Sequence, residues 1–308
     1  MDGRHEPVLL DESLHYLAGE RGGTVVDCTL GLGGHAAALL ERAPTVRLVG
    51  IDRDPEALER AAERLAGFGD RVRLVESRFG DLREALAPLG LPPLAGVFAD
   101  LGVSSLQLDL ARRGFSFRRD GPLDMRMGRD GPTAADVVNS YSEADLESIL
   151  RGYGEEHDAR RIARAIVRAR ARQPIVTTGE LSRVVVSAKG GDRQREARVD
   201  PATRTFQALR LEVNQELREL ERMLDDAVEL LDRDGRLVVI SYHSLEDRVV
   251  KHRLRDLARG EVDPTTGASL AETRALELLT RKPVRPSETE VAANPRARSA
   301  RLRAARRI

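Results

Sequence analysis

The first hundred residues alternate between two hydrophobic patterns, one typical of buried strands and one typical of helices. Four short β-branched runs, each the length of one buried strand, occur at Thr24–Thr29, Arg47–Asp52, Val72–Ser77 and Leu94–Leu101. Helical spacing fills the gaps between them, as in residues 54–67, where Asp54 suits an N-cap and Pro55 suits the first turn. Strands that alternate with helices predict a parallel sheet in an α/β fold.

This alternation stops after Leu101 and resumes about a hundred residues later. Residues 110–205 are predicted to be helical and loop-rich, with turns at Gly121-Pro122 and Gly131-Pro132. The remaining elements are predicted as one long amphipathic helix over about Thr205–Leu231, a strand at Gly235–His243, and a last pair of strands near Arg281–Pro286 and Arg298–Ile308.

The simplest architecture is a doubly wound, Rossmann-like sheet that is interrupted after its fourth strand. Residues 1–109 and 206–308 would form one discontinuous domain, and residues 110–205 an inserted helical domain for substrate recognition. Such sheets bind ligands at the carboxyl ends of their strands, near the point where strand order reverses. An insertion that leaves from the fourth strand is well placed to present a second substrate there.

Composition narrows the class of protein. Hydrophobic residues make up 41% of the 308 residues, enough for a buried core. No apolar run approaches the roughly 20 residues that span a bilayer, and the N-terminus lacks the features of a signal peptide. The one cysteine, Cys28, excludes an internal disulfide and a multi-cysteine metal site, and the histidines lack ligand spacing. We expect a cytoplasmic protein with no membrane contact and no required metal.

Net charge is zero, but the charges are unevenly distributed. Residues 1–110 carry 11 basic and 18 acidic side chains, whereas residues 111–205 carry 19 and 14 and residues 281–308 carry 9 and 2. Positive charge is therefore concentrated in the middle of the chain and at its end, which leaves room for a polyanionic partner.

A glycine-rich turn after the first predicted strand suggests a nucleotide-like cofactor. Gly31, Gly33 and Gly34 permit a tight turn and close backbone approach to a ligand before the next helix. Asp52 ends the second strand 19 residues after Gly33, where an acid commonly binds ribose hydroxyls. Because Gly31, Gly33 and Ala36 also fit the dinucleotide pattern, the glycines alone do not separate NAD from S-adenosylmethionine.

Other strand ends favour S-adenosylmethionine. The Asp27 carboxylate, just before the glycine turn, would repel a pyrophosphate but suits the ammonium group of a methionine moiety. Phe79, after the third strand, offers a face for an adenine ring, although an aromatic residue there is as often part of the core. The fourth strand ends in Asp100, with Ser104, Ser105 and Gln107 close behind it.

Ten stretches of the chain resemble the RsmH (MraW) family of bacterial small-subunit rRNA methyltransferases. They are HEPVLLDE at 5–12, GLGGH at 31–35, GIDRDP at 50–55, DLGVSS at 100–105, RGFSFRRDGPLDMRM at 113–127, YGEE at 153–156, RIARAIV at 161–167, PATRTFQALR at 201–210, SYHSLEDRVVK at 241–251 and NPRARS at 294–299. The glycine turn is generic, whereas the longest stretches are specific. The chain departs from the family pattern at three positions. The family often has glycine in place of Cys28, proline or histidine in place of Leu106, and phenylalanine in place of Tyr242.

The resemblance implies N4-methylation of a cytidine in the decoding region of 16S rRNA, with S-adenosylmethionine as methyl donor. It also implies cofactor binding at Gly33, Gly34, His35, Asp52, Phe79, Asp100 and Gln107. His35 enters through the resemblance alone, and capping of the following helix is its other interpretation.

The mechanism expected from these residues is assistance to a weak nucleophile. A cytosine amine is poorly nucleophilic because its lone pair is delocalised, so an acceptor for its hydrogens would help. Asp100 and Ser104 are placed to serve, and His243 could accept a proton or make a structural hydrogen bond. Phe115 and Phe117 could stack on the base or anchor the insertion. Methylation at carbon 5 of a pyrimidine is disfavoured, because it needs a thiolate nucleophile and the charge of Asp27 would raise the pKa of Cys28.

RNA contact is expected on the inserted domain. Arg160, Arg164, Arg168 and Arg172 recur every four residues and predict a basic stripe, with Arg164 and Arg168 at its centre. The opposite, buried side would be formed by Ile162, Ala165, Ile166 and Ala169. A charge run is usually only a solvated face. The basic tail, including Arg296 and Arg298, is a second candidate.

Two other functions remain open: an NAD-dependent oxidoreductase that uses the same glycine turn, and a non-catalytic rRNA-binding assembly factor. The intact set of Asp27, Asp52 and Asp100 argues against the second. The sequence does not decide between a monomer and a homodimer.

Overall fold

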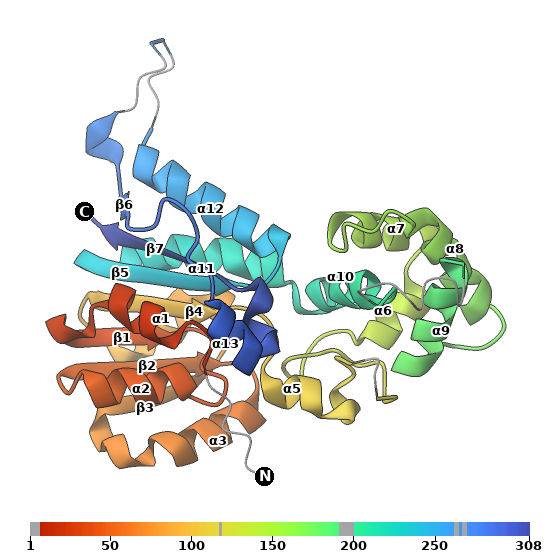
Figure 1. Cartoon of the computed structure of the whole chain (residues 1–308), viewed down its shortest axis with the longest axis horizontal. Helices are drawn as coiled ribbons and strands as arrows, with labels where there is room; N and C mark the ends of the chain where they lie inside the picture. The colour runs from red at the N-terminus through yellow and green to blue at the C-terminus, as the bar shows by residue number, and fades with distance from the viewer. Residues whose placement is uncertain (1–6, 117–118, 191–199, 262–264, 267–269) are drawn as a thin grey trace. The chain divides into compact units, whose positions relative to one another are not determined.

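The computed structural model describes residues 7–116, 119–190, 200–261, 265–266 and 270–308, without the side chain of Ser105. The chain forms two compact units (Figure 1), one of Met1–Gly102 with Leu217–Ile308 and one of Val103–Glu216. We call them the sheet unit and the helical unit. The helical unit extends beyond both ends of the insertion predicted at residues 110–205.

The sheet unit is built on seven strands in the order β3-β2-β1-β4-β5-β7-β6. Their bounds are β1 Gly23–Asp27, β2 Val46–Asp52, β3 Val72–Glu76, β4 Leu94–Asp100, β5 Leu231–Ser241, β6 Leu276–Leu278 and β7 Arg301–Arg307. The first five strands are parallel, and β7 is antiparallel to both of its neighbours. The predicted α/β fold is confirmed, and the four β-branched runs form β1 to β4. Strand order reverses between β1 and β4, so the carboxyl ends of these strands border the expected ligand crevice.

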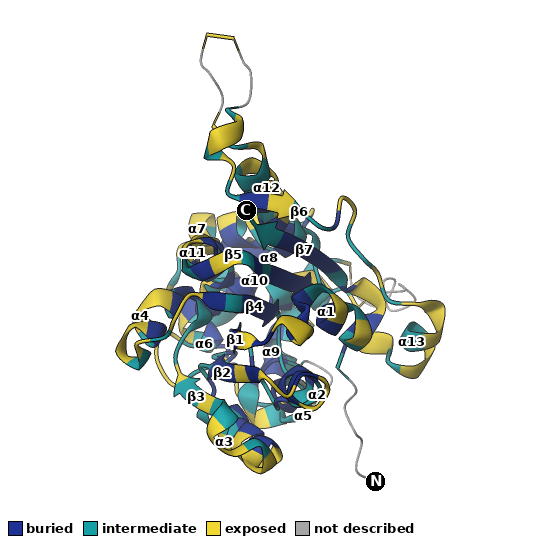
Figure 2. Cartoon of the chain, turned by 90° about the vertical axis from the view of Figure 1, so that its left-hand side faces the viewer, coloured by how far each residue is buried: buried dark blue, intermediate teal, exposed yellow. Residues whose placement is uncertain are grey.

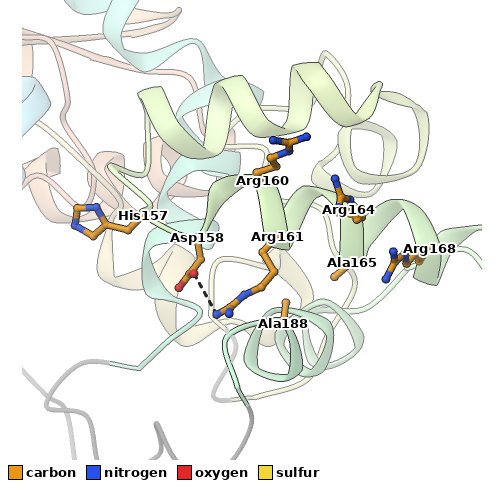
Figure 3. Close-up of a pocket in the computed structure, with 8 residues that line it drawn as sticks. All are labelled: His157, Asp158, Arg160, Arg161, Arg164, Ala165, Arg168 and Ala188. Atoms are coloured by element: carbon orange, nitrogen blue, oxygen red, sulfur yellow. Dashed lines mark ion pairs between the residues drawn. The ribbon is translucent and has the colours of Figure 1, made fainter.

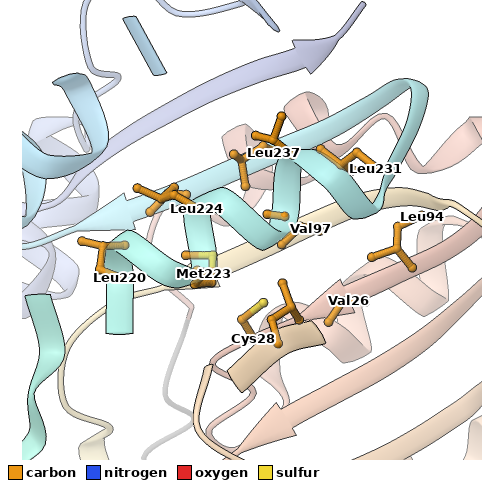
Figure 4. Close-up of a cluster of buried hydrophobic side chains, with 14 of the residues drawn as sticks. Val26, Cys28, Leu94, Val97, Leu220, Met223, Leu224, Leu231 and Leu237 are labelled. Carbon is orange, nitrogen blue, oxygen red and sulfur yellow. The ribbon is translucent and has the colours of Figure 1, made fainter. Parts of the chain in front are cut away.

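Helices cover both faces of the sheet. They are α1 Leu10–Leu17, α2 Gly34–Arg42, α3 Pro55–Leu65, α4 Leu82–Leu86, α11 Glu216–Leu230, α12 Ser244–Arg259 and α13 Glu288–Ala293. Residues of α1, α2 and α3 pack with Val25 and Phe98 on one face, and residues of α4, α11 and α12 pack with Val26 and Val97 on the other. Because neighbouring residues of one strand face opposite sides, the central strands are buried on both (Figure 2). Figure 4 shows α11 lying over these strands through Leu220, Met223 and Leu224.

The helical unit has its own core. Its helices are α5 Ser105–Asp109, α6 Ala134–Ser140, α7 Glu143–Gly152, α8 Ala159–Arg170, α9 Thr178–Ala188 and α10 Thr203–Asn214. Thr133 and Thr177 are the N-cap residues of α6 and α9, and each forms a capping box with the residue three positions later. Ser142 is the N-cap residue of α7. The apolar sides of these helices share one buried cluster, with Leu146, Ile162 and Leu209 at 0% exposure.

Two predicted elements are wrong. The single helix over Thr205–Leu231 is two helices, because Gln215 has a left-handed backbone with φ of 51° that ends α10 before α11 begins. The strand predicted at Arg281–Pro286 lies earlier, as β6, and Val284 makes only an isolated bridge to Leu302. Pro283 and Pro286 flank Val284 and have no N–H to donate to a ladder, which explains the difference.

Within the described residues, no helix is long and apolar enough to cross a membrane. The same residues contain no cluster of three or more His, Cys, Asp or Glu side chains that could hold a metal ion.

Candidate functional site

Three carboxylates end three neighbouring strands at one edge of the sheet. Asp27 ends β1, Asp52 ends β2 and Asp100 ends β4. In the register of the sheet Asp27 pairs with Gly50 and with Phe98, so Asp52 and Asp100 each lie two residues further along their strands. The sequence therefore positions all three acids at the carboxyl edge, as predicted from the strand ends.

The glycine turn is tied to the second of these acids. Gly31 and Gly33 have φ of 52° and 72°, a region that favours glycine, and Gly33 is the N-cap residue of α2. The amide of Gly31 donates to Oδ2 of Asp52 at 2.8 Å, while Oδ1 accepts from the amide of Asp54 at 2.9 Å. Burial raises the pKa of Asp52 to about 6, although these amide hydrogen bonds oppose the shift.

Asp27 lies deepest in the site. Its side chain is 3% exposed and accepts one hydrogen bond from the amide of Thr29 at 3.1 Å. Burial raises its pKa to about 8, and the charges of Asp100 and Asp52 add to the shift. A buried carboxyl group that is short of donors favours a ligand that brings its own positive charge.

Asp100 makes contacts with two elements. Its Oδ1 accepts a hydrogen bond from the Tyr242 hydroxyl at 2.8 Å, and its Oδ2 lies 3.9 Å from Nδ1 of His35. Burial raises the pKa of Asp100 to about 7, the Tyr242 hydrogen bond lowers it, and the charge of Glu246 raises it. His35 is held in turn by Val8, whose carbonyl oxygen lies 2.9 Å from Nε2, and its ring packs on Phe98. His35 therefore faces Asp100 and is not the N-cap of α2.

The ends of β2 and β3 are joined to α11 by an ion-pair cluster. Arg53 follows Asp52, Arg78 precedes Phe79, and both guanidinium groups lie near Oε1 of the buried Glu219, at 3.7 and 3.5 Å. Phe79 is half-buried and packs against the core on this side of the sheet. Its position is compatible with either a core role or one face for a ring.

Ser104 and Gln107 belong to the helical unit, where they form a capping box. The Ser104 hydroxyl accepts from the amide of Gln107 at 3.3 Å, and Oε1 of Gln107 accepts from the amide of Ser104 at 3.1 Å. Both side chains therefore help to begin α5.

His243 caps α12. Its Nδ1 accepts from the amide of Glu246 at 3.4 Å, and its Nε2 lies 3.0 Å from Oε1 of the same residue. The cap therefore uses Nδ1, whereas Nε2 is buried and makes no hydrogen bond among the described residues.

The two phenylalanines proposed for stacking have different outcomes. Phe115 is 9% exposed within the core of the helical unit, which favours anchoring over base stacking. Phe117 lies outside the described residues.

A basic groove of about 740 Å³ runs along α8 (Figure 3). Its lining residues are His157, Asp158, Arg160, Arg161, Arg164, Ala165, Arg168 and Ala188. Arg161 pairs with Asp158 at 3.1 Å, and Arg164 pairs with Glu143 at 3.4 Å. Ile162 and Ile166 are on the buried side of the helix as predicted, whereas Ala165, also predicted there, lines the groove. Arg172 lies beyond the end of α8, so it is not part of a helical stripe.

The part of the basic tail that forms β7 is held by ion pairs. Arg303 and Arg301 pair with Asp247 at 2.7 and 3.5 Å, and Arg306 contacts both Asp234 and Glu277. These contacts hold β7 in place, whereas Arg296 and Arg298, which were named for the second RNA-binding patch, are exposed and lie outside them.

Together the three acids suit a cationic ligand that also carries hydroxyl groups. In the described part of the chain, no arginine or lysine forms an ion pair with Asp27, Asp52 or Asp100. Tyr242 is the site residue that sequence reasoning missed. It lies 142 positions from Asp100, and the sequence gives no signal for that contact.

Comparison with known proteins shows the family to which the chain belongs. The chain is 52% identical to "Ribosomal RNA small subunit methyltransferase H" of Acidiphilium cryptum over 99% of this chain and 97% of that protein. It is 51% identical to the proteins of the same name from Nitratidesulfovibrio vulgaris, over 99% and 95%, and from Thermobifida fusca, over 98% and 93%. The model of the MraW methylase family matches residues 2–308, and the chain therefore belongs to the MraW methylase family.

Proposed function

We propose that this enzyme uses S-adenosylmethionine to methylate the N4 amine of a cytidine in the decoding region of 16S rRNA. The observation that carries the proposal is the set of Asp27, Asp52 and Asp100 at one sheet edge, the first buried and the other two half-buried, each with a raised pKa. These groups offer a pyrophosphate no positive charge, and no arginine or lysine among the described residues pairs with them, which argues against an NAD-dependent oxidoreductase. A cationic methyl donor would favour their ionised form.

The donor's parts match different residues. Asp27 accepts from the ammonium group, with Gly33 and Gly34 allowing the backbone to approach the methionine end. Asp52 accepts from the ribose hydroxyls, while Phe79 provides one face for the adenine. His35, Gly31 and Gln107 complete the proposed binding set. When bound, the sulfonium of S-adenosylmethionine supplies the electrophilic methyl group.

Asp100 has the central role toward the amine. Its carboxylate accepts a hydrogen bond from the amine, so that electron density on nitrogen is greatest as the methyl group approaches. This interaction strengthens as the amine becomes positively charged, so it contributes most in the transition state. Ser104 remains a proposed further acceptor. His243 also remains a proposed proton acceptor through Nε2, because its cap hydrogen bond with the Glu246 amide uses only Nδ1.

The helical unit is proposed to recognise the RNA. Arg160, Arg164 and Arg168 line the same groove. Among the described residues, no carboxylate lies within ion-pair distance of Arg160 or Arg168. Such arginines are suited to phosphates, which give binding a sequence-independent electrostatic component. We expect the reaction to occur in the cytoplasm, where ribosomal RNA is found. The proposal applies to either a monomer or a homodimer.

Two measurements test the proposal. Calorimetry should detect S-adenosylhomocysteine binding and no NAD binding; the reverse result would make the chain an oxidoreductase. Transfer of a labelled methyl group to small subunits, followed by mass spectrometry of nucleosides, should yield N4-methylcytidine. Tight RNA binding with no transfer would instead favour the assembly factor.

A further inference from the structure

The Tyr242 side chain is held against Asp100 from the short segment that joins β5 to α12. Tyr242 follows β5, its backbone amide donates to Oε2 of Glu246 at 2.9 Å, and its hydroxyl donates to Oδ1 of Asp100 at 2.8 Å. The ring packs against the core on the α1–α2 side of the sheet. A Cβ atom built on Gly102 would lie 3.6 Å from Cδ2 of the ring, so Gly102 also lies against it.

The surroundings of Asp100 offer few other groups that stabilise a negative charge. His35 of α2 lies 3.9 Å from Oδ2, while Asp27 of β1 and Glu246 of α12 are themselves acidic. Among the described residues, Asp100 forms no ion pair with an arginine or lysine. The Tyr242 hydroxyl is thus a neutral donor to a carboxyl group that burial would otherwise keep protonated.

We propose that Tyr242 is a positioning residue that keeps Asp100 ionised and turned so that Oδ2 stays available to the ligand. The inference rests on the proposed function, in which Asp100 faces the methyl donor and the target amine. Tyr242 acts as a hydrogen-bond donor and not as a base, because burial and the Asp100 charge raise the pKa of its hydroxyl well above the usual value. No covalent step or proton transfer is assigned to it.

The variant Tyr242→Phe removes the donor and keeps the ring. Loss of a donor to a carboxylate raises the pKa of Asp100 above about 7, so a smaller fraction is ionised at neutral pH. A rise of one pKa unit would weaken S-adenosylhomocysteine binding by about fivefold at pH 7, with recovery toward the wild-type affinity near pH 9. Asp27 also titrates in this range and Asp52 just below it, but both residues are the same in the two proteins.

Calorimetric titrations with S-adenosylhomocysteine from pH 6.5 to 9 test this expectation. The matched control is Tyr141→Phe, which removes a tyrosine–carboxylate hydrogen bond of 2.9 Å to Glu212 inside the helical unit. That control should bind as wild type at every pH. Carboxyl ¹³C NMR of the unliganded protein gives the pKa of Asp100 directly, and this pKa should be higher in Tyr242→Phe.

A double-mutant cycle with Asp100→Asn separates the two proposals. If Asp100→Asn leaves ligand affinity unchanged, Asp100 does not face the donor and its assigned role fails. If Asp100→Asn weakens binding, adding Tyr242→Phe to that variant should weaken it no further. A Tyr242→Phe effect that is absent, independent of pH, or fully additive with Asp100→Asn would overturn the role of Tyr242 while leaving that of Asp100 intact.

Discussion

The Gly31 amide and the Asp52 carboxylate are joined by a hydrogen bond of 2.8 Å across 21 residues of sequence. Because the other oxygen of Asp52 accepts from the Asp54 amide, one side chain holds both the glycine turn and the start of α3. Asp52 therefore has two roles in the proposed site. It is a candidate acceptor for ribose hydroxyls, and it maintains the backbone shape that the ligand meets.

We predict that Asp52→Ala weakens S-adenosylhomocysteine binding and leaves RNA affinity nearly unchanged. Losing hydrogen bonds to a charged group costs about 1.5–3 kcal/mol. Calorimetry measures the ligand, and filter binding measures the RNA. Asp70→Ala is the control. Asp70 is exposed and precedes β3, so it lies at the end of that strand away from the proposed site. Unchanged ligand affinity in Asp52→Ala would remove Asp52 from the site.

The basic groove leads to a second prediction. Replacing Arg164 and Arg168 together with glutamine should weaken RNA binding and reduce the slope of log affinity against log salt by about 1.4, as expected for two phosphate contacts on single-stranded RNA. Of the two single variants, Arg168→Gln should weaken RNA binding more than Arg164→Gln, because Arg164 already pairs with Glu143 at 3.4 Å.

The matched control for this pair is Arg60→Gln with Arg64→Gln. These two exposed arginines have the same spacing, on α3 of the sheet unit. Their replacement should leave the salt slope unchanged. If the Arg164 and Arg168 variant also keeps the wild-type slope and affinity, the arginines of α8 are only a solvated face.

The sequence was sufficient for the elements whose signal is local. The β-branched runs predicted β1 to β4 because parallel strands buried on both faces leave a continuous apolar pattern. The acids that end these strands followed from the same pattern. The N-cap Asp54 was predicted correctly, since its hydrogen bond to the Glu56 amide spans only two residues.

Features set by tertiary contacts were not predictable. The helix break at Gln215 involves no glycine or proline; Asn214 beside it binds the backbone of Met125 and Met127, nearly ninety residues away. The ion pairs of β7 depend on Asp247 of α12 meeting Arg303. The local sequence pattern shows the charges but not their partners.

Stability should depend strongly on the core beneath α11. Leu224 is 0% exposed and packs against the strands with Met223 and Leu237. We predict that Leu224→Ala lowers the free energy of unfolding by about 2–5 kcal/mol, through lost burial and a residual cavity. Urea denaturation measures the change. Val176→Ala, at a residue that is 50% exposed, should have little effect. A loss below about 1 kcal/mol in Leu224→Ala would mean that this core readily closes around the cavity.

The raised pKa of Asp27 predicts how stability changes with pH. An ordinary aspartate in the unfolded chain ionises near pH 4, whereas folded Asp27 ionises near about pH 8. Between these values the unfolded chain releases the proton and the folded protein retains it, so rising pH favours unfolding. Asp27→Asn should match wild type near pH 4 and become progressively more stable up to pH 8, by at most about 1.4 kcal/mol per pH unit. Thermal denaturation without ligand measures this. A difference that does not grow with pH would show that Asp27 is ionised in the folded protein.

The chemical step depends most on Asp100. Asp100→Ala should lower the single-turnover rate about 100- to 10,000-fold, the range for groups that act on protons in the transition state. RNA affinity should fall much less, because the carboxylate interacts most strongly when the amine becomes positively charged. Asp100 is also proposed to contact the donor, so the rate must be measured at saturating S-adenosylmethionine, with saturation verified for the variant. A wild-type rate under those conditions would mean that Asp100 only binds the donor. Ser104, the backbone carbonyls of residues 101–105 and Nε2 of His243 would then be the remaining acceptors.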